Sequence, residues 1–146
     1  MMSRGCSPAV YDGGTRAALD ALRGRLPTDR LAAVWADCTA APYTDRGVWV
    51  HGDVAPGNIL MRDRRFCGLI DFGILGTGDP ACDYAMAWTY FEAAERRVFL
   101  GGLSCGMVAR ARGWALWKSL ITYDDENPDS RQAARHAVRE ILGETG

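Results

Sequence analysis

The feature that most constrains the fold of this chain is a polar loop, residues 51–58, that stands among short β-prone runs. Residues 48–50 precede the loop, and two further runs, residues 58–61 and 66–70, follow it with a charged turn at 62–65 between them. Apolar runs joined by a polar turn are typical of a β-hairpin. The sequence therefore predicts a loop held between short strands, where polar side chains can face a bound molecule.

The loop and the hairpin carry three oxygen-bearing side chains in a fixed order. Asp53 lies in the loop, Asn58 begins the first hairpin strand, and Asp71 follows the second strand. Because paired strands lie side by side, we expect the hairpin to place Asn58 next to Asp71. Mg²⁺ prefers hard oxygen ligands, and a carboxylate on a loop can orient and deprotonate a hydroxyl group. The pattern therefore indicates phosphoryl transfer, with Asp53 as the base and Asn58 and Asp71 as metal ligands.

Three neighbouring polar residues are expected to support this site rather than to react. We expect the His51 ring to brace the loop by a hydrogen bond to the backbone near Asp71, without acting as an acid or a base. Asp79, followed by Pro80, has the form of a helix N-cap. Asp83 stands among apolar neighbours and needs partners if it is buried, so we expect it to accept hydrogen bonds from backbone amides of the loop.

Helical periodicity covers most of the remaining chain. The expected helices span about residues 15–26, 28–41, 80–91, 93–100, 107–121 and 128–142. Residues 1–14 are rich in Gly, Ser and Pro and are expected to form an irregular lead-in, and residues 73–78 are expected to form a glycine-rich loop. The sum, mostly helices with one small hairpin, predicts the α+β class.

Composition limits the class of protein and its partners. The chain has 146 residues, of which 48% are hydrophobic, and a net charge of −1, as in an ordinary single globular domain. The balanced charge argues against nucleic acid or an anionic membrane as a partner. The five cysteines are scattered and include no C-x-x-C pair, so neither a cysteine zinc site nor a disulfide framework is expected. A cytoplasmic location fits this cysteine usage best.

Residues 49–88 resemble the aminoglycoside phosphotransferase family, which has a protein-kinase-like fold. The matching residues are His51-Gly52-Asp53, Pro56, Asn58, Ile70-Asp71-Phe72-Gly73 and Gly78-Asp79-Pro80-Ala81-Cys82-Asp83. Residues 112–118 also resemble a helix common in this family, and a weaker similarity extends over residues 15–40. These motifs are specific for the superfamily but not for the substrate.

The resemblance implies roles for the motif residues. It implies that Asp53 is the catalytic base and that Asn58 and Asp71 bind Mg²⁺. It also implies that Asp83 is a structural acid behind the catalytic loop. The phosphoryl donor that the resemblance implies is ATP or another nucleoside triphosphate.

The acceptor is expected to be a hydroxyl group of a small molecule of the aminoglycoside type. Protein kinases usually carry Arg where Gly52 stands, and no Ala-Pro-Glu sequence follows Asp71, which disfavours a protein acceptor. An aminoglycoside is a polycation, so its pocket should be lined by carboxylates. The candidate carboxylates are Asp124, Asp125 and Glu126, with Glu92 and Glu95 as others. Relatives in the family phosphorylate macrolides, choline, homoserine or sugars, and the sequence does not choose firmly among these acceptors.

Enzymes of this family hold ATP between two lobes, and this chain resembles the second lobe. The sequence contains no glycine-rich loop followed by a Val-Ala-x-Lys strand, and its only lysine, Lys118, lies on a late expected helix. We therefore expect residues 15–146 to form the C-terminal lobe without a nucleotide-binding lobe, to bind Mg-ATP weakly and to turn over negligibly. A lobe without its partner exposes apolar surface, so self-association is also expected.

Two other functions are alternatives. The chain could be a non-catalytic remnant or binding module that keeps the fold of the second lobe. It could also be a metal-dependent hydrolase that uses His51, Asp53 and Asp71. The hydrolase is disfavoured, because His136 is the only other imidazole and such sites usually need more ligands.

Overall fold

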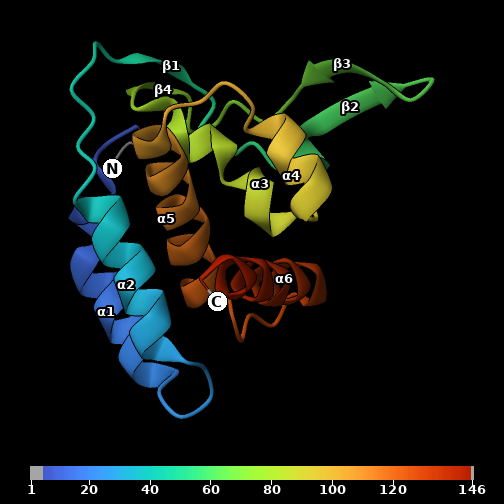
Figure 1. The fold of residues 1–146 in the computed structure, drawn as a ribbon. Coiled ribbons are helices and arrows are strands. Elements are labelled where there is room, and N and C mark those ends of the chain that lie inside the picture. The colour runs from blue at the N-terminus through green and yellow to red at the C-terminus, as the bar shows by residue number, and fades with distance from the viewer. Residues whose placement is uncertain (1–4, 146) are drawn as a thin grey trace.

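Helices form most of the structure, and the strands form two separate antiparallel sheets (Figure 1). The computed structural model describes residues 5–145. The α-helices are α1 (Asp12–Ala21), α2 (Thr28–Thr39), α3 (Met86–Thr89), α4 (Ala93–Phe99), α5 (Cys105–Ile121) and α6 (Pro128–Glu144). The strands are β1 (Val48–Val50), β2 (Ile59–Arg62), β3 (Arg65–Leu69) and β4 (Gly76–Gly78), and the 3₁₀ helices are η1 (Pro8–Tyr11), η2 (Pro56–Asn58) and η3 (Pro80–Tyr84). The α+β class expected from the sequence is confirmed.

Helix α5 lies at the centre of the core. Figure 1 shows α1 and α2 side by side along one flank of α5, and α6 crossing near its lower end. Helix α5 is apolar on most sides, as expected of a helix that its neighbours bury. Its buried apolar residues are Ala111, Trp114, Ala115, Leu116, Trp117 and Leu120. Gly113 lets α2 approach closely, because a Cβ atom there would overlap the sulfur atom of Cys38.

Helical structure begins earlier than expected from the sequence. Residues 8–14, which the sequence assigned to an irregular lead-in, form η1 and the first turn of α1, so that prediction is wrong for them; residues 1–4 lie outside the described part. Asp12 favours the early start, because its carboxylate accepts hydrogen bonds from Arg16 Nε and Trp35 Nε1, both at 2.8 Å. The hydrogen bond from Arg16, followed by that from Trp35, lowers the pKa of Asp12.

Four other boundaries differ from the expected ones, and the first is the end of α1, which lies at Ala21 instead of near Leu26. Residues 76–78 pair with β1 as strand β4 instead of remaining in the glycine-rich loop. The helix expected over residues 80–91 is divided into η3 and α3. Helix α6 does not end at Gly143 but includes it in its last turn and continues to Glu144. Helices α2, α4 and α5 and both hairpin strands lie within about two residues of their predicted bounds.

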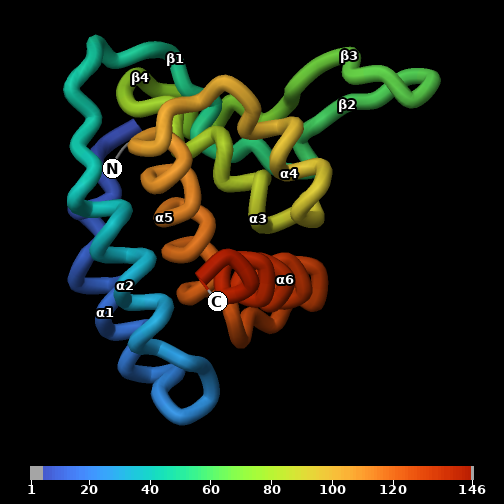
Figure 2. Tube along the Cα trace, in the orientation of Figure 1, coloured from blue at the N-terminus to red at the C-terminus, as the bar shows by residue number. Residues whose placement is uncertain are grey.

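The β2–β3 hairpin projects away from the helices, whereas β1 and β4 lie near the upper end of α5 (Figure 2). The hairpin turn contains Asp63 and Arg64 with φ of 49° and 63°. Two successive residues with positive φ are the mark of a type I′ turn, whose twist matches that of the strands. Among the described helices, none combines the length and the apolar character that crossing a membrane requires.

Candidate active site

The loop that follows β1 is held from behind by Asp83. This residue lies in η3, and its carboxylate oxygens accept the backbone N–H groups of His51 at 2.8 Å and Gly52 at 2.7 Å. Gly52 has a φ of 85°, in the left-handed region that favours glycine. The loop therefore leaves β1 with a fixed geometry, and Asp83 makes the contacts of a residue that supports it.

The His51 ring joins the loop to the segment before Asp71. The residue is buried, and its Nδ1 accepts the Asp53 N–H at 3.3 Å. Because Nδ1 is the acceptor, Nε2 carries the ring proton and donates to the Ile70 carbonyl at 2.8 Å. Backbone groups thus engage both ring nitrogens. This arrangement argues against the hydrolase alternative, which needs His51 as a metal ligand.

Asp53 lies at the centre of a polar contact network. Its Oδ1 is 2.8 Å from Lys118 Nζ, and the two side chains are each about one-third exposed. The Asn58 amide nitrogen donates to the Asp53 carbonyl at 2.9 Å and lies 3.4 Å from Asp53 Oδ2. The Asp53 carboxylate is therefore fixed on one side by Lys118 and on the other by Asn58.

Asp71 follows the second hairpin strand, in a turn tied to the same loop. The Ile70 N–H donates to the Asn58 carbonyl at 3.0 Å, which continues the β2–β3 pairing by one step. The Phe72 ring packs on the His51 ring with their centroids 4.8 Å apart. Asp71 itself is exposed and has a φ of 62°, a strained conformation for most residues but one that Asp tolerates. The residues on both sides of Asp71 are thus held against the loop.

A cavity of about 690 Å³ opens beside this loop. Residues 55–57 of the loop form one wall, helices α5 and α6 form others, and the segment between α3 and α4 closes the remaining side. Lys118 lines the cavity and pairs with Asp53, whereas Asp53 itself lines a separate small pocket that Lys118 also borders. Lys118 therefore links the cavity to the Asp53 carboxylate. The other ionisable lining residues are Tyr90, Glu92, Asp129, His136 and Arg139.

Comparison with protein-family models decides the family. Residues 10–138, which include every residue of the loop, the hairpin and the cavity walls except Arg139, match the phosphotransferase enzyme family. The chain belongs to the phosphotransferase enzyme family. Searches of the curated proteins and of the solved structures found no significant match. Family membership supports a phosphotransferase at the level of the reaction class and leaves the acceptor open.

Two contacts of this phosphotransferase-family site are not predicted by the sequence: Lys118 with Asp53, and Arg110 with Asp79. The sequence places Lys118 on a late helix, between Trp117 and Ser119, which are both buried in the structure. A charged side chain in such a position needs a partner, and this was the available signal. Asp79 caps η3 as expected, with Ala81 N–H donating to it at 3.0 Å, but it also pairs with Arg110 Nε at 2.6 Å in the buried core.

The acidic run before α6 is engaged within the chain. Asp124 accepts hydrogen bonds from Arg25 at 2.6 and 2.8 Å. These hydrogen bonds are the main cause that lowers the pKa of Asp124. Asp125 accepts the Asn127 N–H at 3.0 Å, which likewise lowers its pKa. Neither these two residues nor Glu126 is among the described residues that line the cavity beside the loop. The structure therefore does not bring this run to Asp53, whereas it does bring Glu92 to the cavity.

Proposed function

We propose that this chain carries the base and the metal ligands of a site that transfers a phosphoryl group from ATP to a hydroxyl group of a small molecule. The observation that carries the proposal is the network around Asp53, in which Lys118 and Asn58 fix the carboxylate beside a cavity. Phosphoryl transfer needs a carboxylate held in a fixed position to orient the acceptor hydroxyl, and this network holds Asp53 in that way in a member of a phosphotransferase family.

The donor atoms of Asn58 and Asp71 fit Mg²⁺. The amide nitrogen of Asn58 is turned toward Asp53, which leaves the amide oxygen for a cation. Asp71 is exposed and directly follows Ile70, whose N–H donates to the Asn58 carbonyl, which supports a position of the Asp71 carboxylate near Asn58. An amide oxygen and a carboxylate oxygen match the hard ligands of Mg²⁺. When bound, Mg-ATP supplies the phosphoryl group and the positive charge that stabilises it during transfer.

Asp53 orients the acceptor hydroxyl and takes its proton. Lys118 holds Oδ1, and the Asn58 amide nitrogen lies 3.4 Å from Oδ2. Because a carboxylate oxygen accepts more than one hydrogen bond, Oδ2 can also accept one from the acceptor hydroxyl. Lys118 acts through Asp53 and is a positioning residue in this scheme. His51 and Asp83 keep the loop in place through backbone contacts and do not take part in proton transfer.

The cavity fits a small polar acceptor. Its volume of about 690 Å³ lies in the range of small-molecule sites. Its charged lining consists of Lys118, which pairs with Asp53, of two carboxylates, Glu92 and Asp129, and of the cation Arg139. This lining accommodates an acceptor with about one positive charge more readily than a polycation. We therefore extend the acceptor class from aminoglycosides to small amino or neutral alcohols.

We expect the chain described here to use ATP poorly. Residues 5–145 contain only two-stranded sheets and no element that would cover the nucleotide in the manner of a kinase first lobe. Phosphoryl transfer depends on positioning the nucleotide, so turnover should fall far below the roughly 1–100 s⁻¹ of kinases.

Metal-nucleotide binding tests the site without requiring turnover. Mn²⁺ replaces Mg²⁺ in such sites, and its unpaired electrons broaden nearby NMR signals. Mn-ATP should broaden backbone signals of residues 52–58 and 70–73. Asp71→Asn and Asn58→Ala should weaken this binding at least about tenfold. The matched control, Asp63→Asn at the hairpin tip, should leave it unchanged. Broadening that is absent at the loop, or equal in all three variants, would contradict the metal site.

Long incubation with γ-labelled ATP tests the transfer step. The panel should contain an aminoglycoside, a macrolide, choline, homoserine and a sugar. We expect slow formation of one phosphate ester, which Asp53→Asn should slow strongly but measurably. Mn-ATP binding without transfer to any acceptor would favour the non-catalytic binding module. Ordinary turnover that depends on Asp53 would support the reaction and overturn the expectation of weak activity.

A further inference from the structure

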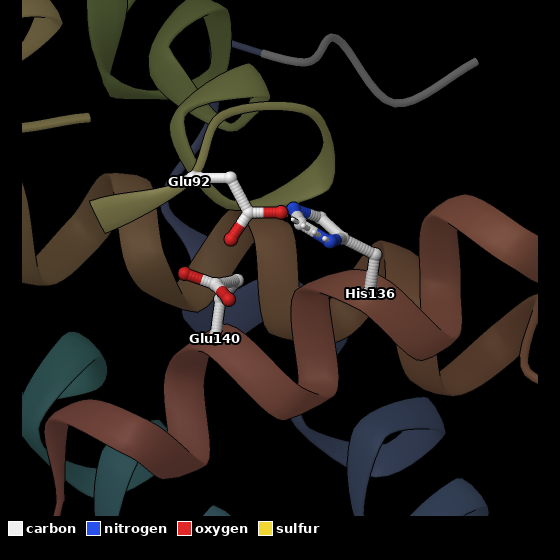
Figure 3. Close-up of side chains that lie close together, drawn as sticks. All are labelled: Glu92, His136 and Glu140. Carbon is white, nitrogen blue, oxygen red and sulfur yellow. Dashed lines mark ion pairs between the residues drawn. The ribbon is translucent and has the colours of Figure 1, made fainter. Parts of the chain in front are cut away.

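A second polar cluster lies where helix α6 passes the start of α4. Glu92, His136 and Glu140 each offer one ligand atom, and these atoms lie within 4.8 Å of one another. Figure 3 shows the three side chains converging, with His136 and Glu140 on successive turns of α6 and Glu92 on the segment opposite. We propose that this cluster binds a divalent transition-metal ion of the Zn²⁺ class. The proposal goes beyond phosphoryl transfer and does not depend on it.

The His136 ring is oriented as a metal ligand should be. Its side chain is only 14% exposed, and its Nε2 lies 3.3 Å from the Phe91 carbonyl. Because a carbonyl oxygen only accepts hydrogen bonds, Nε2 carries a ring proton, and in the neutral ring Nδ1 then keeps its lone pair. Nδ1 faces Glu92 Oε1 at 3.9 Å. Histidines that bind metal ions usually donate their other ring N–H to a carbonyl or carboxylate in this way.

Buried Arg96 orients Glu140. Its Nη1 donates to Glu140 Oε2 at 2.8 Å, and its Nε donates to Glu144 Oε1 at 2.8 Å. Arg112 also approaches Glu144, at 3.6 Å. With neutral His136, the three carboxylates of Glu92, Glu140 and Glu144 exceed the two guanidinium groups by one negative charge. A divalent cation would bind where this charge is least compensated, at Glu92, which pairs with no Arg or Lys in the described part of the chain.

The ligands can close around an ion with a small movement. Zn²⁺ binds nitrogen and oxygen ligands at about 2.0–2.2 Å, which places tetrahedral ligand atoms about 3.4 Å apart. The Glu92 side chain is 71% exposed and is free to move by the remaining ångström or so. A histidine among the ligands favours Zn²⁺, Ni²⁺ or Cu²⁺ over Mg²⁺. Three protein ligands leave one coordination position, which faces the cavity because Glu92 and His136 also line it.

Metal titration of the purified chain tests the site. The exposed thiols of Cys67 and Cys105 can also bind Zn²⁺, so the parent protein should carry Cys67→Ser and Cys105→Ser. Zn²⁺ titrated into the metal-free parent, in competition with a chromophoric chelator, should occupy one site. Millimolar Mg²⁺ should not displace it. Co²⁺ in place of Zn²⁺ should give the visible absorption of a low-coordinate nitrogen and oxygen site.

Variants assign the ligands. His136→Gln and Glu92→Gln should each weaken Zn²⁺ binding at least about 100-fold, because losing a ligand costs more than losing an outer contact. The control is Glu95→Gln. Glu95 lies in the first turn of α4, which directly follows Glu92, and this variant should bind Zn²⁺ like the parent. Glu92 is exposed, so Glu92→Gln should fold normally even if His136→Gln does not, which circular dichroism would show. No binding in the parent at micromolar Zn²⁺, or equal affinity in Glu92→Gln, would overturn the proposal.

Discussion

At the scale of the residue, the motif spacing indicated which side chains gather at the site but not what holds them. Asp53, Asn58 and Asp71 lie within 18 positions of each other in the chain. The β2–β3 hairpin, with the backbone hydrogen bond from Ile70 to Asn58, is a local structure that this short span can form. Lys118 reaches Asp53 across 65 positions. A contact over such a distance depends on helix packing, which periodicity does not encode. This is why the sequence predicted the loop but not the contact between Lys118 and Asp53.

Lys118→Met separates the positioning role of Lys118 from a structural one. The Lys118–Asp53 pair is about one-third exposed, and such pairs contribute only about 0.2–1 kcal/mol to stability. We therefore expect the free energy of unfolding in urea to change by less than about 1 kcal/mol. Residual transfer from labelled ATP should nevertheless fall by about the factor seen in Asp53→Asn.

The double variant provides the check on that reading. Residues that act as one unit are strongly non-additive, so Lys118→Met combined with Asp53→Asn should be no slower than Asp53→Asn. Additive losses in the double variant would show that Lys118 acts independently of Asp53.

The backbone at Asp71 gives a second residue-scale prediction. Its φ of 62° lies in the left-handed region, which costs most residues about 1–2 kcal/mol. Asp71→Gly should therefore unfold at equal or higher urea concentration than the parent, whereas Asp71→Val should be less stable by about 1–2 kcal/mol. Both variants should lose Mn-ATP binding. A more stable Asp71→Val would show that the backbone adopts another conformation there.

At the scale of the element, helix α5 supports the site at two points. Arg110, near its start, pairs with Asp79 ahead of η3, and η3 presents Asp83 to the loop. Lys118, two turns further along α5, contacts Asp53 directly. The sequence predicted α5 and the Asp79 cap within narrow limits, because both follow local patterns. It missed β4, because the run Gly76–Gly78 has little strand propensity and forms a strand only through pairing with β1.

The Asp79–Arg110 pair is predicted to anchor η3 to α5. The side chains are 2% and 8% exposed, so removing one partner leaves a buried charge uncompensated. We expect Arg110→Met to lower the free energy of unfolding by about 3–5 kcal/mol. Asp79→Asn combined with Arg110→Met should recover part of this loss, because no buried charge then remains. Urea unfolding followed by tryptophan fluorescence measures both, and a loss under 1 kcal/mol, roughly that of a surface pair, would contradict the anchoring role.

At the scale of the whole molecule, thiol reactivity reports on the packing of the core. Cys38 lies against Gly113 between α2 and α5, and burial raises its pKa to about 12. It should stay protonated at pH 8, roughly four units below that pKa, and react slowly with a disulfide reagent. Exposed Cys67 and Cys105 should react fast. Mass spectrometry of the labelled protein would identify the sites, and rapid labelling of Cys38 in the folded chain would mean that α2 and α5 separate readily.

The distribution of exposed apolar side chains predicts self-association of this chain. Most of the large apolar residues that the described chain exposes lie within residues 48–75, and Trp49 and Phe66 are 74% and 63% exposed. Such a concentration on strands and their connections is typical of a surface that another body covers. We expect sedimentation equilibrium to show a dimer or larger species at high protein concentration. Trp49→Ser with Phe66→Ser should shift it toward the monomer, whereas Val98→Ser, at an even more exposed apolar position on α4, should not. A monomer at all concentrations, or an equal effect of Val98→Ser, would show that this surface does not drive association.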